Sequence, residues 1–303
     1  MKHANTEFVA YNKATVNREV FPPAAPEMSR LSLLENADKQ AVLEFLKIRP
    51  VHTVVMTSLI QDNNLENAEN RGKFYGYRNQ NGTLEGIALI GHTTLVEART
   101  EDSLKAFSII ARQSETPIHL MMSDGNTIES FWKHYAGDTR QPRLVCSELL
   151  FELNFPFFVQ QCGWDVRLAD ASELEQIAVA HDEVAFIESG VSPMLKDREE
   201  FLKRCLKRIE QNRTFVVFEN GKLVFKSDIV AETTETIYLE GIYVAPEYRG
   251  QGVGSSCLSN LCLQLMERVT NICLLTNVEF KSAHKSFQRA GFKNTDCCQI
   301  IFV

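Results

Sequence analysis

The fold is decided by one stretch of sequence, VAPEYRGQGVGS, which runs from Val244 to Ser255. Apolar residues predict a strand over residues 236–244 that leads into this stretch, and the helical spacing of apolar residues from Leu258 onward predicts a helix after it. The glycines between them let the backbone approach a ligand closely, and the start of the helix presents unpaired N–H groups with a partial positive charge. This order of elements predicts an anion site, most naturally for a phosphate or pyrophosphate.

The spacing of the glycines restricts the ligand further. They fall at positions 250, 252 and 254, which is neither the G-x-x-x-x-G-K-S/T of nucleotide-hydrolysing P-loops nor the G-x-G-x-x-G of dinucleotide-binding folds. The alternative interpretation is a strand-to-helix turn that binds nothing, because short motifs also match by chance.

The segment RGQGVG at residues 249–254 resembles the Arg/Gln-x-x-Gly-x-Gly/Ala signature of the GNAT acyltransferase superfamily. The V-x-P-x-x-R-G pattern that begins at Val244 and the Gly291-Phe292 pair near the end of the chain strengthen the match. The resemblance implies that loop amides hold the pyrophosphate of acetyl-coenzyme A and that the preceding strand pairs with its pantetheine arm. The cofactor-binding residues implied in this way are Ile242, Tyr243, Val244, Arg249, Gly250, Gln251, Gly252, Val253, Gly254, Ser255, Asn277 and Phe287.

The resemblance extends over the whole second half, where the predicted order of helices and strands is the GNAT order. Segments such as FKSD at residues 225–228 and ESGVSP at residues 188–193 are similar to those of two-domain bacterial GNAT proteins with a degenerate first half. In the first half, residues 91–99 hold no glycine-rich turn. We therefore expect an α/β fold with a mixed sheet, in tandem GNAT-like domains. Its parts are a flexible arm over residues 1–30, a degenerate GNAT-like domain over 31–160 and an acyl-coenzyme A N-acyltransferase domain over 161–303.

Local signals predict several element boundaries. The dipeptides Asn81-Gly82 and Asn220-Gly221 lie between apolar runs and predict tight hairpin turns. The pattern Ser172-x-x-Glu175 predicts a capping box that starts one helix, and Asp197-x-x-Glu200 predicts the same for the helix over residues 198–211.

Composition excludes several other classes of protein. The chain has 303 residues, of which 44% are hydrophobic and 23% charged, and a net charge of -7 argues against nonspecific binding of nucleic acid. No apolar run has the length of a membrane span, the N-terminus lacks the apolar core of a signal peptide, and the histidines show no metal-ligand spacing. The eight cysteines form no Cys-x-x-Cys pair. These features predict a cytoplasmic protein without a bound metal, a membrane anchor or a nucleic-acid partner.

Acetyl transfer by direct attack requires a base that takes a proton from the amine. Glu240 is the first candidate, because it precedes a predicted bulge at Gly241 on the strand that lines the acceptor cleft of the related fold. Its apolar neighbours would raise its pKa towards neutrality. A solvated or salt-bridged strand glutamate is the alternative interpretation. Glu188 and Asp228 are the further candidates.

The general acid is where the chain departs from the superfamily. Many GNAT proteins place a tyrosine four residues before the Gly-Phe pair, and here that position is Phe287, which cannot donate a proton. The position of a common asparagine is Phe280, with Asn277 as the nearest substitute. Water, His284 or Ser286 could replace the tyrosine, or the thiolate could leave unassisted. A surface histidine without a role is the alternative interpretation of His284.

The sequence therefore predicts an acetyl-coenzyme A-dependent N-acetyltransferase that acts on a primary amine. The alternatives are a catalytically weak GNAT module that binds coenzyme A or a partner without transfer, and an acyltransferase with a longer acyl or an aminoacyl donor. The acceptor, either a small-molecule amine or an amine of a peptide or protein, stays open because fold does not decide substrate. The first half could cover the acceptor cleft or mediate formation of a homodimer.

Overall fold

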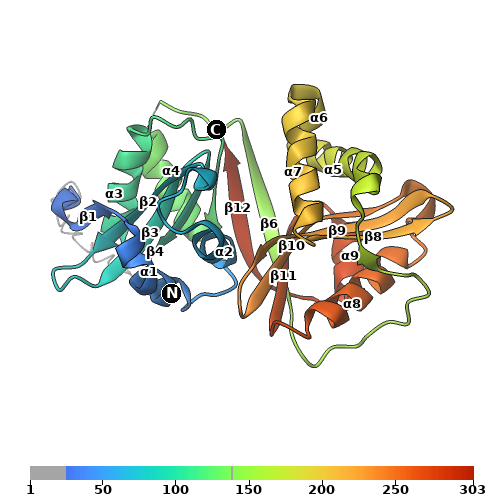
Figure 1. The fold of residues 1–303 in the computed structure, drawn as a ribbon. Helices are drawn as coiled ribbons and strands as arrows, with labels where there is room; N and C mark the ends of the chain where they lie inside the picture. Colours follow the sequence, from blue (N-terminus) through green and yellow to red (C-terminus); the bar gives the residue numbers. More distant parts are fainter. Residues whose placement is uncertain (1–24, 138) are drawn as a thin grey trace, which may run out of the picture.

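The structure is a computed structural model that describes residues 25–137 and 139–303. Most of the arm predicted over residues 1–30 lies outside the described residues, and the part within them contains the 3-10 helix Met28–Arg30. The first half continues with strands and helices in alternation (Figure 1). These elements are β1 Leu31–Leu33, α1 Lys39–Leu46, α2 Val54–Asn63, β2 Gly72–Arg78, β3 Leu84–Gly91, β4 Thr93–Ala98, α3 Glu101–Arg112, β5 Leu120–Asp124, α4 Gly125–Ala136 and β6 Leu144–Leu153.

The second half repeats this order of elements after a connecting segment, with one extra short helix. Its elements are β7 Arg167–Leu168, α5 Leu174–Ser189, α6 Pro193–Lys196, α7 Arg198–Glu210, β8 Thr214–Glu219, β9 Lys222–Glu232, β10 Thr236–Val244, α8 Val253–Leu265, β11 Asn271–Asn277, α9 Lys281–Ala290 and β12 Lys293–Phe302. Shorter 3-10 helices are Asn36–Asp38, Ala68–Asn70, Ala171–Glu173 and Pro246–Tyr248.

All strands join one 12-stranded mixed sheet in the order β1-β2-β3-β4-β5-β12-β6-β11-β10-β9-β8-β7. Within each half the ladders are antiparallel except for one parallel pair, β4 with β5 and β10 with β11. The expected α/β fold with a mixed sheet is therefore confirmed.

The two halves exchange their last strands. The C-terminal strand β12 pairs with β5 of the first half, and β6 of the first half pairs with β11 of the second. The exchanged strands also pair with each other from Lys293 opposite Glu152 to Phe302 opposite Leu144, and they run side by side at the centre of the molecule (Figure 1). One continuous sheet thus contains the strands of both halves. The domain boundary placed at residue 160 stays a prediction.

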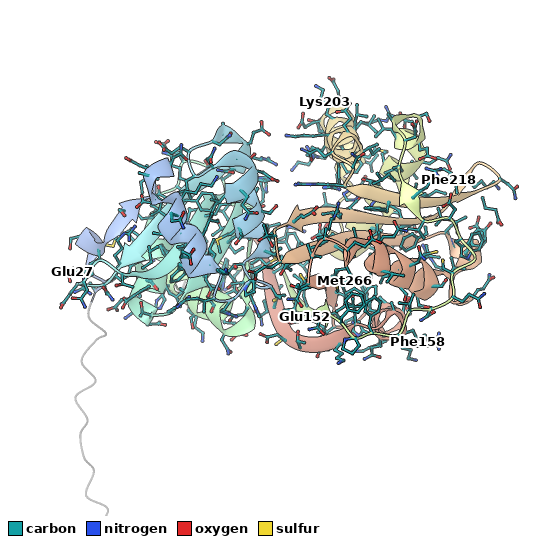
Figure 2. All side chains as sticks on the ribbon, turned by 60° about the horizontal axis from the view of Figure 1, so that its bottom comes forward. Glu27, Glu152, Phe158, Lys203, Phe218 and Met266 are labelled. Carbon is teal, nitrogen blue, oxygen red and sulfur yellow. The ribbon has the colours of Figure 1, made fainter. Side chains whose placement is uncertain are left out.

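Helices cover both faces of the sheet in each half. In the first half, α1 and α2 pack on one face and α3 and α4 on the other. In the second half, α8 and α9 share the largest core cluster, while α5 and α7 pack on the opposite face. Figure 2 shows this layering: Lys203 on α7 and Phe158 in the connecting segment lie on opposite sides of the sheet. A smaller cluster joins the halves where Val54 of α2 meets Tyr238 of β10 and Cys273 of β11.

The turns and helix caps predicted from local sequence signals are confirmed in part. The turn between β8 and β9 is the expected tight one, with φ of 50° at Asn220 and 76° at Gly221. The loop between β2 and β3 is wider, because the Asn79 side chain accepts hydrogen bonds from the amides of residues 81 and 83. Asp197 caps α7, because its side chain accepts from Glu200 N–H at 3.1 Å, but its own N–H donates to Pro193 O at 3.0 Å, so the predicted reciprocal capping box is wrong there.

The capping box predicted at Ser172 and Glu175 is wrong. The box consists of Asp170 and Glu173, where Asp170 N–H donates to Glu173 Oε2 at 2.8 Å. Asp170 is as strong an N-cap as a serine and has a glutamate at the same spacing, so the helical turn starts two residues earlier.

The strand exchange predicts that both halves lose stability when β12 is weakened. Ile301 is 2% exposed and packs in the core of the first half. We expect Ile301→Ala to lower the free energy of unfolding by about 2–5 kcal/mol in one cooperative transition, followed by circular dichroism in denaturant. Ile300→Ala, at a half-buried neighbour, is the matched control and should cost less. Two separate transitions, of which the variant shifts only one, would contradict this expectation.

Candidate functional site

A groove opens in the second half where two parallel strands diverge. The ladder between β10 and β11 ends at the pair Leu239 and Leu274. Beyond this pair lies a cavity of about 300 Å³, which we call the inner compartment. Its walls come from α5 with Glu188, from β10 residues 239–244, from the end of β11 and from residues 280–287.

A second cavity of about 380 Å³, the outer compartment, continues from the first. It lies between the glycine-rich loop at residues 249–255 and helix α9. The two compartments share six lining residues: Ile242, Val244, Arg249, Ser282, Ala283 and Phe287. They therefore form one groove that runs from the glycine-rich loop to the carboxylates of the inner compartment.

The strand β10 carries a bulge within the inner compartment. Glu240 lies opposite Asp228 and Tyr243 lies opposite Lys226, so two residues of β10 face only one of β9. Gly241 occupies the bulge with φ of 59°, a conformation that favours glycine. The predicted bulge at Gly241 is confirmed.

The glycine-rich loop leaves the start of helix α8 accessible from the outer compartment. Gly250 and Gly252 have φ of 75° and 85°, and Gly252 is the N-cap of α8. A glycine has no side chain that could accept from the first amides of the helix, so these N–H groups remain available to a ligand. Lys285 and Arg289 add positive charge on the opposite wall. The outer compartment therefore suits a phosphate or pyrophosphate.

The other implied cofactor residues lie in different environments. Arg249 lines both compartments, but its side chain is held by Val244 O at 2.8 Å and Glu183 Oε1 at 3.0 Å, so it supports the wall of the groove. Gln251 is exposed, and its side-chain nitrogen donates to Glu247 O at 2.6 Å. Val253 is buried in the core of the second half.

Of the aromatic positions near α9, two line the inner compartment. Phe280 and Phe287 both face it, and Phe287 is 7% exposed with its ring against Phe151 and Phe292. Tyr243 lines it from β10. These apolar walls suit an uncharged arm of a ligand rather than its phosphates.

Like Gln251 and Val253, the candidates His284 and Asn277 do not line the groove. His284 is buried, not a surface residue, and its Nε2 lies 2.8 Å from the backbone oxygen of Asn277 while its ring packs near Phe151. Asn277 itself uses its side-chain oxygen to accept from Glu279 N–H at 3.0 Å. The candidates for the acid that remain beside the groove are water and Ser286, which lines the outer compartment.

Asp228 is not a suitable base, although the sequence made it a further candidate. Its carboxylate is 1% exposed and accepts from Lys226, Arg208 and Thr214 at 2.5, 3.0 and 2.8 Å. Burial alone would raise its pKa, but Lys226, His181 and Arg208 hold the pKa well below its usual range. The group stays ionised and does not face the groove.

The carboxylates at the inner end of the groove differ in environment. Glu240 is exposed, contrary to the expected apolar burial, and accepts from the Tyr238 hydroxyl at 2.8 Å. Glu188 reaches the groove from α5 and is exposed, as Glu240 is. Desolvation by the groove walls, followed by the negative charges of Glu240 and Glu148, raises the pKa of Glu188 to about 8. The inner end is therefore an acidic site in which the pKa of the Glu188 carboxyl is raised towards neutrality.

Glu148 was missed by the sequence analysis. It lies on β6, opposite Asn277 of β11 and Cys298 of β12, and is 8% exposed. Desolvation raises its pKa to about 7, against a hydrogen bond with Asn277 that lowers it. A buried carboxylate in a largely apolar strand is a signal for a special environment, but only the strand exchange brings this residue next to the second half.

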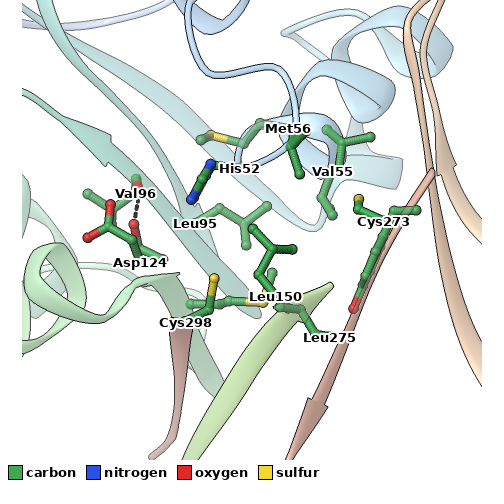
Figure 3. Close-up of a pocket in the computed structure, with 15 residues that line it drawn as sticks. His52, Val55, Met56, Leu95, Val96, Asp124, Leu150, Cys273, Leu275 and Cys298 are labelled. Carbon is green, nitrogen blue, oxygen red and sulfur yellow. Dashed lines mark hydrogen bonds between the residues drawn. The ribbon is translucent and has the colours of Figure 1, made fainter. Parts of the chain in front are cut away.

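The equivalent splay in the first half is closed. The parallel ladder of β4 and β5 ends at Leu95 and Met122, and beyond it the Ser123 hydroxyl donates to Val96 O at 2.7 Å (Figure 3). Helix α2 covers the opening, which leaves a largely apolar cavity of about 40 Å³. This volume admits at most one or two water molecules and no acyl chain.

The first-half counterpart of α8 is α3, and its N-terminus is capped. Its counterpart of the glycine-rich loop is Arg99-Thr100, whereas residues 91–93 form the turn between β3 and β4, so the location expected from the sequence is wrong. Thr100 accepts from Ser103 N–H and caps α3, and Glu101 and Asp102 lie in the first turn. A cap and two carboxylates disfavour a phosphate at this helix.

The described residues contain no helix long and apolar enough to cross a membrane. Over the same residues, no group of three or more histidine, cysteine, aspartate or glutamate side chains has the arrangement to hold a metal ion.

The comparisons with known proteins agree with this geometry. Residues 210–294 match the family model described as an acetyltransferase (GNAT) domain. A comparison with curated proteins found no significant match in sequence.

Solved structures with the same fold cover most of the chain. An acetyltransferase from the GNAT family of Colwellia psychrerythraea is 15% identical, with 90% of this chain and 99% of its own covered and a TM-score of 0.54. A Drosophila protein is 12% identical, with 90% of this chain and 98% of its own covered and a TM-score of 0.68. A tandem GNAT protein from the clavulanic acid biosynthesis pathway is 10% identical, with 90% of this chain and 97% of its own covered and a TM-score of 0.56. At these identities the likeness shows the fold.

Proposed function

Because the second half carries a GNAT domain and the whole chain has the two-domain GNAT fold, we propose that the protein transfers an acetyl group from acetyl-coenzyme A to a primary amine. The observation that carries this proposal is the continuous groove from the glycine-rich loop to the carboxylates of the inner compartment. One end suits a pyrophosphate, the middle is apolar, and the far end suits a protonated or neutral amine.

The residues present fit acetyl-coenzyme A. The amides at the start of α8, with Lys285 and Arg289, would hold the pyrophosphate. Added Cβ atoms at Gly250 and Gly252 would meet nothing within 4 Å, so the loop faces open space, whereas one at Gly254 would lie 3.0 Å from Val244 Cγ2. The unpaired edge of β10 at residues 242–244 would pair with the pantetheine arm. When bound, acetyl-coenzyme A supplies the acetyl group as a thioester.

The base is best assigned to Glu188. It lines the inner compartment, and a pKa of about 8 is close to the value at which a carboxylate takes a proton efficiently at neutral pH. Glu240, the first candidate from the sequence, is exposed like Glu188, but its carboxylate accepts from the Tyr238 hydroxyl at 2.8 Å, whereas Glu188 has no hydrogen-bond partner among the described residues. Its role in this proposal is to raise the pKa of Glu188 by charge repulsion.

The backbone of the bulge supplies the group that polarises the thioester. The amide of Ile242 follows Gly241, and Ile242 lines the part of the groove shared by the two compartments. A fixed N–H donor at this point stabilises negative charge on a carbonyl oxygen as the amine attacks.

Phenylalanine at position 287 favours a second candidate function, a GNAT module that binds coenzyme A without transfer. The ring cannot donate a proton to the departing thiolate. We expect Phe287→Tyr to retain or raise turnover, because the ring already lines the groove. The measurement is kcat for release of coenzyme A at a fixed amine concentration. A loss of more than about tenfold would mean that no hydroxyl is tolerated there.

The proposed compartment is the reducing cytoplasm. All eight cysteines of the chain are free thiols, which supports this proposal because exported proteins more often pair their cysteines.

The test of the proposed function has two steps. Calorimetric titration of the purified protein with acetyl-coenzyme A should give one binding site per chain. A panel of small amines, amino acids and peptides is then screened for release of free coenzyme A, detected with a thiol reagent. Binding without release for every amine would favour the binding module. An absence of binding would reject both.

A further inference from the structure

A charged cluster lies buried beneath the bulge of β10, outside the groove. Lys226 and Asp228 project from the same face of β9 and are each 1% exposed. Their charged atoms are 2.5 Å apart, and Arg208 of α7 contacts the same carboxylate oxygen at 3.0 Å. His181 of α5 adds its Nδ1 at 3.4 Å from both Lys226 and Asp228. The mechanism above uses none of these side chains.

One member of the cluster contacts the backbone of the groove. Lys226 Nζ donates to the carbonyl oxygen of Gly241 at 3.2 Å. An added Cβ on Gly241 would lie 2.9 Å from Lys226 Nζ and 3.0 Å from Asp228 Oδ2, so the bulge rests directly on the buried charges. Arg208 contacts Asp228, but no hydrogen bond joins it to Gly241 among the described residues.

The direction of this hydrogen bond sets the direction of the next amide. The carbonyl of Gly241 points to the face of the sheet that α5 and α7 cover, where Lys226 lies. In a trans peptide the C=O and the following N–H point in opposite directions. The N–H of Ile242 therefore points to the other face, against which Ile242 packs and on which α9 lines the groove.

We infer that Lys226 is a positioning residue for acetyl transfer, which holds the Gly241–Ile242 peptide so that its N–H faces the thioester carbonyl. This inference rests on the proposed function. It assigns the buried ammonium a task that packing does not require, since apolar residues can replace a buried ion pair without loss of stability. Asp228 holds the Lys226 side chain in place through their 2.5 Å contact, and Arg208 contacts the same carboxylate without reaching Gly241.

The experiment compares Lys226→Met with the matched control Arg208→Met. Both variants remove one cation from Asp228, but only the first removes the donor to Gly241. The probe is acetyl-coenzyme A labelled with 13C at the acetyl carbonyl, because the chemical shift of this carbon reports polarisation of the C=O bond without any acceptor. We expect the wild type and Arg208→Met to share a downfield shift on binding, and Lys226→Met to lose it. Turnover should follow, with kcat lowered about 10- to 100-fold in Lys226→Met and KM for acetyl-coenzyme A little changed.

The fold is checked by circular dichroism, because a single buried charge without its partner destabilises a protein. If Lys226→Met does not fold, the double variant Lys226→Met/Asp228→Leu removes both charges and still lacks the donor, and the same loss of the carbonyl shift is expected. Equal shifts in the wild type and in the variant without Lys226 overturn the inference while leaving the proposed function intact. A wild type that does not bind the labelled probe overturns the proposed function, and the inference with it.

Discussion

Gly252→Glu is expected to weaken binding of acetyl-coenzyme A by at least about 100-fold, roughly 2.7 kcal/mol. Gly252 is the N-cap of α8, and its φ of 85° places any side chain in open space beside the first amides of the helix. A glutamate there adds a negative charge where the pyrophosphate should lie, and its carboxylate can itself accept from the free N–H groups. The measurement is the dissociation constant from calorimetric titration of both proteins.

The matched control for this prediction is Gly82→Glu. Gly82 has φ of 80° in the loop between β2 and β3, and an added Cβ there also meets nothing within 4 Å. Both substitutions therefore carry a similar backbone cost for a residue with a side chain in the left-handed region. Only the variant at position 252 should lose binding. Equal affinities in the two variants would show that the loop does not hold the pyrophosphate.

The glycine-rich loop and the bulge could be predicted from the sequence because both are local. Left-handed backbone at Gly250 and Gly252 follows from glycine at fixed spacing before a helix. The bulge needed only a glycine within an apolar strand. Each of these features depends on a few consecutive residues, and no distant part of the chain can change them.

Strand exchange could not be predicted, because each half has an equivalent last strand. The burial patterns of β6 and β12 do not identify their partners, and the sheet order is decided by contacts between distant parts of the chain. Glu148 was missed for the same reason. From the sequence it lies at the end of the first half, and only the pairing of β6 with β11 places it beside Asn277.

The candidates on α9 and β9 show a second limit of prediction from sequence, which concerns the residues that line a cavity. Helical spacing places His284 one turn from Phe287, and both are buried, yet only Phe287 lines the groove. Periodicity separates a buried face from an exposed one, but it does not separate the part of that face that lines a cavity from the part that meets the sheet. Asp228 likewise has a side chain suited to a base, but its carboxylate is paired with Lys226 and Arg208. The sequence does not show that these two residues lie beside it.

The two halves share a fold but differ at each point where a cofactor would bind. The second half has a glycine N-cap, and the first has Thr100 with two carboxylates in the next turn. In the second half β10 and β11 diverge, whereas in the first half the Ser123 hydroxyl of β5 donates to Val96 O of β4 and bridges the corresponding strands. The two halves therefore differ in a helix cap, in charge and in one hydrogen bond, while β6 of the first half pairs with β11 of the second.

Glu188→Gln is expected to lower kcat by about 100- to 10,000-fold, the usual range for removal of a general base. The pKa of Glu188 is raised to about 8, so the carboxylate form that accepts a proton is the minor one at pH 7. In the wild type, kcat/KM should therefore rise with pH and level off above about 8, and this rise should vanish in the variant. Glu175→Gln, at an exposed position on the same helix that pairs with Arg198, is the control and should behave as wild type.

Glu240→Gln separates this assignment from titration of the amine substrate, which also produces a rise with pH. The negative charge of Glu240 is the second largest cause, after desolvation, of the raised pKa of Glu188. Its removal should move the rise in kcat/KM to lower pH, while desolvation keeps the pKa above the ordinary value of 4.5. At pH 7 this variant should therefore be at least as active as wild type. A rise at the same pH in both proteins would assign it to the amine, and a loss of activity as large as in Glu188→Gln would return the role of base to Glu240.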